Sequence, residues 1–218
     1  MSYIYIVRHG QSLANVRGGF AGRTDYPLSE LGQKQARMTA DYLKNTHIEV
    51  VLSSPLTRAK QTAAPIAADR GLAVLDRPDF IEMNFGAFEG KRLTEVEASY
   101  PGAGTLWKNE MHNMVFPEGE STKECYARAV KAICSVAEEY RGKDICIASH
   151  GAFIRCMHCY LLGLDISEIG SVPWADNASV MTLDNRDGSP ILLSPPYSEH
   201  MGEFATGVSK AMADFQKK

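Results

Sequence analysis

The sequence predicts a single three-layer α/β domain with a central, mostly parallel sheet flanked by helices. Branched apolar runs alternate with helical segments along the chain, the order expected of parallel strands joined by crossover helices. Three predicted strands end in polar segments, the first at Arg8-His9-Gly10, and ligands of such sheets bind beyond the carboxyl ends of the strands. The 218 residues suffice for one large core, and no linker divides them, so residues 1–218 are expected to form one domain.

The individual elements follow from apolar periodicity, capping residues and turn signals. Strands are expected at 3–8, 48–53, 72–75 and 144–149, and a hairpin is expected from 179–184 and 191–194. Helices are expected at 30–44, at 55–69 with Pro55 in the first turn, from the capping box Ser121-x-x-Glu124 to near Gly142, at 152–162 and at the polar C-terminus. Residues 91–118 are predicted to form a small helical cap.

Composition excludes several classes of protein. The 23 basic and 26 acidic residues give a formal net charge of -3, so a binder of long polyanions such as nucleic acid is not expected. The N-terminus lacks the pattern of a signal peptide, and no apolar run is long enough to span a bilayer. The five cysteines do not form the pattern of a disulfide framework, so we expect a cytoplasmic protein with no membrane partner.

Cationic side chains gather where three predicted strands end. Arg8 and His9 follow the first strand, Arg58 lies in the helix after Ser53-Ser54-Pro55, and His150 follows the strand at 144–149. Each cationic group also lies near a predicted helix N-terminus, where free N–H groups favour an anion. Taken singly, each residue is typical of a surface loop or a half-buried side chain. Their shared position predicts a local anion site in a mildly acidic protein, as a small phosphate ester requires.

The residues of this site resemble a known family. Arg8-His9-Gly10-Gln11-Ser12 with Asn15, the run 25–32, Ser53-Ser-Pro-Leu-x-Arg-Ala-x-Gln-Thr62 and Ser149-His-Gly151 are similar, in order, to the motifs of the histidine phosphatase superfamily, also called phosphoglycerate mutase-like. The similarity extends from residue 3 to about residue 184. The tail from about residue 195 carries no motif of this kind.

The resemblance implies a mechanism and a role for each residue. His9 would be the nucleophile that forms a phosphohistidine, with Arg8, Arg58 and His150 around the transferring group. Glu82 would donate a proton to the leaving group and then activate water, whereas its rival Glu89 looks structural. The implied substrate-binding residues are Arg8, Asn15, Gly22, Arg58 and Gly151. No metal and no cofactor are expected.

The phosphatase branch is favoured over the mutase branch. Only the 28 residues from Lys91 to Glu118 separate Gly90 from Gly119, whereas cofactor-dependent mutases carry a longer insertion with more basic residues. Ala21 also stands where the mutases have a threonine. The prediction is therefore a metal-independent phosphomonoesterase acting on a small phosphorylated substrate. The alternatives are a cofactor-dependent phosphoglycerate mutase and a non-catalytic phospho-ligand binder. The complete catalytic set argues against the binder, because a binder does not need the acid Glu82.

Other features permit two interpretations. Trp107, Met111 and Met114 are spaced to form one helix face, and core packing is favoured over lining the leaving-group side of the site. Cys156-x-x-Cys159 with His158 has no second ligand pair, so buried helix cysteines are favoured over zinc. Asp176 and Asn177 are assigned to a turn rather than to substrate contact. A homo-oligomer is possible, but the sequence does not define the oligomeric state.

Overall fold

The central sheet has six strands in the order β3-β2-β4-β1-β5-β6. A computed structural model describes residues 2–207 of the chain. Strands β1, β2, β3 and β4 run parallel to one another. At one side of this group β5 pairs antiparallel with β1, and β6 pairs antiparallel with β5. The strands are β1 (Tyr3–Arg8), β2 (Val50–Ser53), β3 (Val74–Asp76), β4 (Ile145–Ser149), β5 (Val180–Asp184) and β6 (Ile191–Tyr197). The predicted mostly parallel sheet with a C-terminal hairpin is confirmed.

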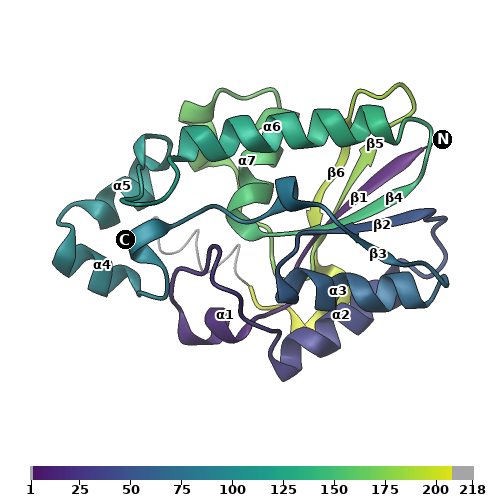
Figure 1. Ribbon diagram of the computed structural model, residues 1–218, viewed down its shortest axis with the longest axis horizontal. Helices are drawn as coiled ribbons and strands as arrows, with labels where there is room; N and C mark the ends of the chain where they lie inside the picture. The colour runs from purple at the N-terminus through teal and green to yellow at the C-terminus, as the bar shows by residue number, and fades with distance from the viewer. Residues whose placement is uncertain (1, 208–218) are drawn as a thin grey trace.

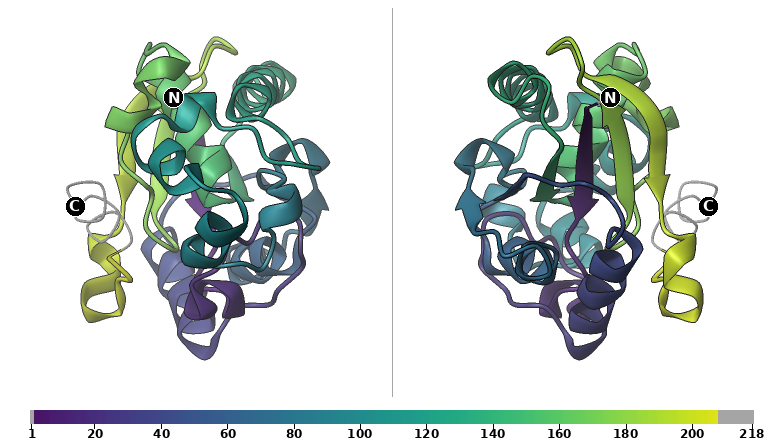
Figure 2. Two further views of the ribbon diagram at one scale, coloured as in Figure 1. Left: turned by 90° about the vertical axis from the view of Figure 1, so that its left-hand side faces the viewer. Right: turned by 90° about the vertical axis from the view of Figure 1, so that its right-hand side faces the viewer.

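Helices cover both faces of this sheet (Figures 1 and 2), with α2 and α3 on one face and α6 and α7 on the other. The helices are α1 (Leu13–Arg17), α2 (Glu30–Tyr42), α3 (Thr57–Ala68), α4 (Leu93–Ser99), α5 (Ala103–Asn109), α6 (Thr122–Glu139) and α7 (Gly151–Leu161). Within residues 2–207, no helix is long and apolar enough to cross a membrane.

The strands alternate their side chains between two apolar cores, one on each face of the sheet. In β1, Ile4 and Ile6 pack in the core under α6 and α7, whereas Val7 packs in the core under α2 and α3. In β4, Ile147 and Ala148 divide in the same way. Because consecutive strand residues point to opposite faces, continuous apolar runs are needed where both faces are covered.

The parallel register brings the predicted catalytic segments to one edge of the sheet. Arg8 at the end of β1 pairs with Ser149 of β4, and Ala148 of β4 pairs with Ser53 of β2. The residues that follow these three strands, His9, Ser54 and His150, therefore emerge side by side. This edge carries the candidate site.

Three details differ from the sequence-based expectations. Helix α3 begins at Thr57, so Pro55 precedes the helix instead of occupying its first turn. The 91–118 insertion forms α4 and α5, at the left of Figure 1, and α5 ends at Asn109, so the face predicted from Trp107 to Met114 is not one continuous helix. Residues 199–204 form a short 3₁₀ helix, and the rest of the predicted C-terminal helix lies outside the described residues.

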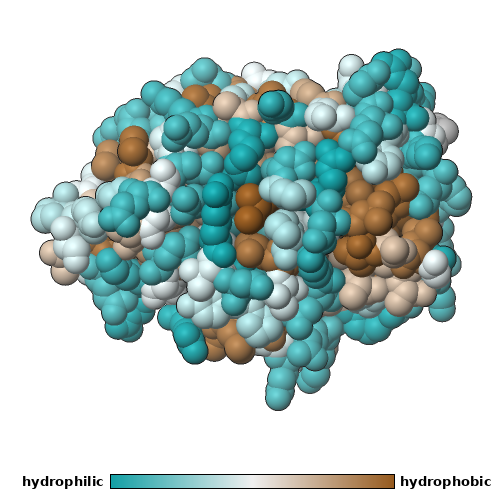
Figure 3. Space-filling view, viewed as in Figure 1, coloured by the Kyte–Doolittle hydropathy of each residue, from teal (hydrophilic) through white to brown (hydrophobic). Residues whose placement is uncertain are grey.

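The face shown in Figure 3 is mostly polar, with an apolar patch over β2 and β3 at one edge of the sheet. Exposed Leu75 belongs to this edge, in the short β3.

Candidate active site

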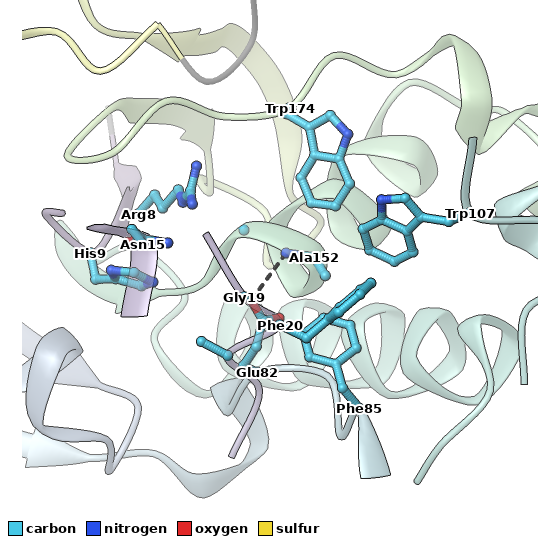
Figure 4. A pocket seen from close by; sticks show the side chains of 12 residues that line it. Arg8, His9, Asn15, Gly19, Phe20, Glu82, Phe85, Trp107, Ala152 and Trp174 are labelled. Atoms are coloured by element: carbon cyan, nitrogen blue, oxygen red, sulfur yellow. Dashed lines mark hydrogen bonds between the residues drawn. The ribbon is translucent and has the colours of Figure 1, made fainter. Parts of the chain in front are cut away.

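A cavity of about 190 Å³ opens at the carboxyl ends of β1 and β4. Figure 4 shows Arg8, His9 and Asn15 on one side of it and the rings of Trp107 and Trp174 on the other. The lining residues are Arg8, His9, Asn15, Gly19, Phe20, Ala21, Glu82, Phe85, Trp107, Gly151, Ala152 and Trp174. One end of the cavity is thus ionic and the other aromatic.

His9 follows β1 and is almost completely buried, with 3% of its surface exposed. Its Nδ1 lies 2.7 Å from the carbonyl oxygen of Gly10. A carbonyl only accepts hydrogen bonds, so Nδ1 carries the proton in the neutral ring and Nε2 keeps its lone pair. Burial, reinforced by the charges of Arg58 and Arg8, holds the pKa of His9 well below its ordinary value of 6.5. At neutral pH the ring is therefore neutral and able to act as a nucleophile.

Arg8 and Arg58 supply positive charge beside this ring. Arg8 lines the cavity and donates from Nη1 to the carbonyl of Ala175, and burial lowers its pKa to about 10, so it remains charged at neutral pH. Arg58 is completely buried and donates to the carbonyls of Gly22 and Thr24 over 2.6 and 3.0 Å. The guanidinium of Arg58 therefore also fixes the loop that carries Gly22.

His150 lies next to His9, with 5.2 Å between the ring centroids. Its Nε2 hydrogen-bonds to the hydroxyl of Ser54 over 2.6 Å. Burial is the main cause that holds the pKa of His150 well below its ordinary value, followed by the charge of Arg58. Two neutral imidazoles therefore lie side by side, and the charges of Arg8 and Arg58 act on both of them.

Three buried nitrogen atoms of this cluster have no hydrogen-bond partner within residues 2–207: Arg8 Nε, Arg58 Nε and His150 Nδ1. Buried polar atoms are normally paired, and leaving one unpaired costs about 1–3 kcal/mol. A group rich in acceptor oxygens would satisfy such nitrogens. The chemistry of the cluster therefore fits a phosphoryl group.

Glu82 lines the cavity and is 5% exposed. Its carboxylate accepts from the backbone N–H of Ala152 over 3.2 Å (Figure 4) and from that of Phe153 over 2.9 Å, both at the N-terminus of α7. Burial raises the pKa of Glu82, although the N–H of Met83, the charge of Arg58 and the two N–H groups of α7 oppose the shift. A carboxyl group with a raised pKa suits proton donation and subsequent proton removal.

Arg128 of α6 holds the segment that carries Glu82. Its guanidinium donates to the carbonyls of Ile81 and Glu82, over 2.8 and 3.3 Å, and pairs with the carboxylate of Glu120 over 2.7 Å. The same carboxylate accepts from the N–H of Asn84 over 2.8 Å. One ion pair therefore fixes the backbone on both sides of the proposed acid.

Glu89 has the structural role expected for it. Its carboxylate accepts from the N–H groups of Gly22, Arg23 and Thr24 and from the hydroxyl of Thr24. A Cβ added at Gly22 would lie 2.3 Å from the backbone carbonyl oxygen of Met83 as well as 2.2 Å from this carboxylate, so only glycine fits there. Glu89 thus stabilises the 22–24 loop and does not line the cavity.

The predicted site residues divide into two groups. Arg8, His9, Asn15, Glu82 and Gly151 line the cavity. Arg58, His150 and Gly22 are buried outside this lining, and the N–H of Gly22 is donated to Glu89.

Two glycines of the site also lie close to other parts of the protein. A Cβ at Gly10 would lie 2.5 Å from the carbonyl of Gly32, and one at Gly151 would lie 3.2 Å from the guanidinium carbon of Arg8. Both glycines therefore allow close packing within the protein, between backbones at Gly10 and against Arg8 at Gly151.

Several residues of the site were missed in the sequence. Ser54 belongs to the family motif that begins at Ser53, but nothing in the sequence indicates that its hydroxyl reaches His150. Asn177, assigned to a turn, donates to the carbonyl of His9 over 3.0 Å and so supports the nucleophile. Phe20 and Trp174 come from segments without regular periodicity, so no pattern placed them in the cavity.

The potential metal motif in α7 is part of the core. Cys156, His158 and Cys159 are all buried, and burial raises the pKa of Cys159 to about 11. Among residues 2–207, no group of three or more histidine, cysteine, aspartate or glutamate side chains is placed to hold a metal ion.

The doubly covered parallel sheet with a histidine and arginine cluster at its strand ends defines a class of phosphoryl-transfer enzymes. Residues 4–195 match the histidine phosphatase superfamily (branch 1), and the chain belongs to this family. It is 34% identical over 97% of its length to the whole of phosphoserine phosphatase 1 of Hydrogenobacter thermophilus. It is also 34% identical to GpmB, a probable phosphoglycerate mutase of Yersinia pestis, over 75% of this chain and 76% of GpmB.

Among solved structures, YhfR of Bacillus stearothermophilus superimposes with a TM-score of 0.87, over 92% of this chain and all of that one, at 22% identity. This similarity supports the fold. The family and the full-length relative together show that the chain is a phosphatase.

Proposed function

We propose that the chain hydrolyses small phosphate monoesters through a phosphohistidine on Nε2 of His9. The observation that carries this proposal is the neutral, Nδ1-protonated imidazole beside three buried nitrogens without protein partners in the described residues. A deprotonated Nε2 attacks phosphorus, and the surrounding donors bind the oxygens on which charge is spread in the transition state.

The reaction has two steps. In the first, the Nε2 lone pair forms the N–P bond, the bond between phosphorus and the ester oxygen breaks, and the Glu82 carboxyl gives its proton to that oxygen. In the second, the Glu82 carboxylate accepts a proton from water as the water oxygen bonds to phosphorus, and the N–P bond breaks. Inorganic phosphate leaves, and His9 and Glu82 return to their starting states.

The other site residues position the phosphoryl group in this proposal. Arg8 Nε and His150 Nδ1 donate to its oxygens, and Arg58 acts through its charge and its unpaired Nε. Asn15 and Gly151 contact substrate from the cavity wall. Gly22 contributes by holding the 22–24 loop with Glu89.

A phosphatase is favoured over a phosphoglycerate mutase as the main activity. A mutase substrate carries a second anionic group, and Arg8 is the one basic side chain besides His9 that lines the cavity among residues 2–207. Ala21, at the position of the mutase threonine, lines the cavity without offering a hydroxyl. The reaction as proposed uses no metal and no cofactor, because the two arginines supply the positive charge.

The relatives indicate which esters to test first. Phosphoserine is the first candidate, because the Hydrogenobacter protein of that name aligns over its full length. A cytoplasmic location and the absence of a nucleic-acid partner are further parts of this proposal, and they rest on the composition of the chain.

A phosphate-release assay tests the proposal. Purified protein is offered phosphoserine, both monophosphoglycerates and p-nitrophenyl phosphate in the presence of a chelator, with His9→Ala as the matched control. We expect release by the unchanged protein and none above background with His9→Ala. Release that survives His9→Ala, or that stops with the chelator, would contradict the mechanism. Interconversion of phosphoglycerates stimulated by 2,3-bisphosphoglycerate, faster than hydrolysis, would support the mutase alternative.

A further inference from the structure

The aromatic end of the cavity offers a surface for the leaving group. The four rings that line it come from separate parts of the chain: Phe20, Phe85, Trp107 and Trp174. Phe20 packs edge-on against Phe85 and Trp107 with centroid distances of 5.1 and 5.0 Å, and Trp107 lies 5.6 Å from Trp174. The edge-to-face contacts of Phe20 are a favourable arrangement of aromatic rings, so these side chains stabilise one another as a wall.

Charged partners for a leaving group are absent from the described lining. Within residues 2–207, the ionisable side chains of the cavity are Arg8, His9 and Glu82, and all three are assigned to phosphoryl transfer. An amino-acid or carboxylate leaving group would bring charges into a largely aromatic space. Burying a charge without a partner is costly, whereas burying a ring is favourable.

Arg155 does not supply the missing charge. It is 1% exposed and donates to the carbonyls of Val172 and Gly170 over 2.8 and 3.2 Å. Its guanidinium lies 4.6 Å from the ring centroid of Trp174 and does not line the cavity. Arg155 thus holds Trp174 in place, and its positive charge at that ring opposes binding of a second cation there.

From this wall we infer that the enzyme prefers phosphate esters whose leaving group is an uncharged aromatic or apolar ring. The inference rests on the proposed function, because it concerns the leaving group of the ester that His9 attacks. Phe20 and Trp174 are the specificity-determining residues, because both line the cavity and belong to loops outside the strand-end cluster.

The test compares esters of primary alcohols, so that the leaving oxygens are chemically similar. These are 2-phenylethyl phosphate, phosphocholine and O-phosphoserine, with methyl phosphate as a reference without a side group. We expect kcat/KM for 2-phenylethyl phosphate to exceed that of each of the other three by about 10-fold or more, the value of burying one ring. A higher kcat/KM for phosphoserine or for phosphocholine would overturn the inference.

Variants assign the effect to the wall. Trp174→Ala and Phe20→Ala should each lower kcat/KM for 2-phenylethyl phosphate about 10-fold while changing methyl phosphate less than about 3-fold. Tyr42→Ala is the matched control, because Tyr42 is an exposed aromatic residue outside the cavity, and it should change neither value. If Trp174→Ala is unstable, Trp174→Leu replaces it, because leucine keeps more apolar volume. Trp174→Leu should retain part of the preference for 2-phenylethyl phosphate over methyl phosphate. Equal losses for both esters in the wall variants would contradict the assignment.

The two proposals fail in different ways. Hydrolysis that prefers phosphoserine and still requires His9 would contradict only the inference about the leaving group. Loss of the His9 requirement would contradict the mechanism itself, whichever ester is preferred.

Discussion

The two ends of the cavity are built in different ways. The phosphoryl end is made by residues that follow neighbouring parallel strands, and His9 and His150 are fixed there by the register of β1 and β4. The leaving-group end is made by rings from outside the sheet. Trp107 comes from α5, whereas Phe20 and Trp174 come from irregular segments near α1 and between α7 and β5. Backbone hydrogen bonds of the sheet fix the first end, whereas packing between side chains fixes the second.

This difference separates chemistry from specificity. A change at the strand ends should alter the reaction of every ester by a similar factor, because all esters share the phosphoryl group. A change in the aromatic wall should alter the ranking of esters and leave the shared step intact. The following predictions test this separation.

Glu82→Gln has the largest expected effect among these variants. The amide cannot give or take a proton, so phosphoenzyme formation from alkyl esters should slow by about 10²–10⁴-fold for every ester. The result is measured as the single-turnover rate with two esters that differ only in the leaving group. If the rate for the ester with a ring and the rate for the ester without one fall by different factors, Glu82 affects specificity, which would contradict the division between the two ends.

The pH profile of the unchanged enzyme tests the same residue. The pKa of His9 is lowered, so the neutral nucleophile persists below pH 6.5 and the acid limb lies below that value. The pKa of Glu82 is raised, so the protonated acid persists above pH 4.5 and the basic limb of phosphorylation lies above that value. Single-turnover rates measured across pH should show a basic limb above pH 4.5 and no acid limb at or above pH 6.5, and Glu82→Gln should lack the basic limb. A basic limb unchanged in that variant would assign it to another group.

Arg58→Met should lower kcat/KM by on the order of 100-fold for every ester, the usual cost of one electrostatic donor. The variant also removes the hydrogen bonds to the 21–24 loop, so thermal unfolding is measured in parallel. Arg37→Met is the control, because Arg37 is an exposed side chain that forms ion pairs with Asp41 and Asp69 away from the cavity. An effect on activity no larger than that of Arg37→Met would show that Arg58 is only structural.

Arg128→Met should lower kcat about 10-fold, because a small displacement of the acid is costly even when the chemistry is unchanged. Removing this positive charge beside the Glu82 segment should also raise the pKa of Glu82 and move the basic limb to higher pH. Arg128→Lys should restore part of kcat. A lower stability with an unmoved pH profile would mean that Arg128 only stabilises the fold.

Ser54→Ala should have the smallest effect, about 5-fold on kcat/KM, the value of one net hydrogen bond of about 1 kcal/mol. The hydroxyl orients His150 through Nε2, so the loss should be the same for esters with and without a ring. Competition between two esters in one reaction measures this directly. A change in their ratio would contradict the division between the two ends.

The sequence was informative where local rules determine position. Strand periodicity and the polar residues after each strand predict that His9, Arg58 and His150 meet at one edge. The register of the sheet brings His9 and His150 to that edge, and Arg58 follows β2 in α3. Glu82 was identified only through the family resemblance, because a glutamate in an irregular segment has no distinctive pattern. The structure shows what such a pattern omits, namely the N-terminus of α7 that binds its carboxylate.

The sequence was least informative where distant segments meet. Arg128, Ser54 and Trp174 act through contacts with residues far away in the chain, and no spacing rule encodes those contacts. Trp107 illustrates the limit, because it is both buried in the core and part of the cavity wall. The two interpretations of that residue were not exclusive.

The most direct test of the central claim is the identity of the phosphorylated residue. Enzyme mixed with a slight excess of ³²P-labelled ester is quenched within one turnover, and the labelled peptide is sequenced. We predict an alkali-stable, acid-labile label on His9 that approaches one phosphate per chain and disappears at the rate of phosphate release. A label on any other residue, or full turnover with no labelled His9 at any time, would contradict the mechanism.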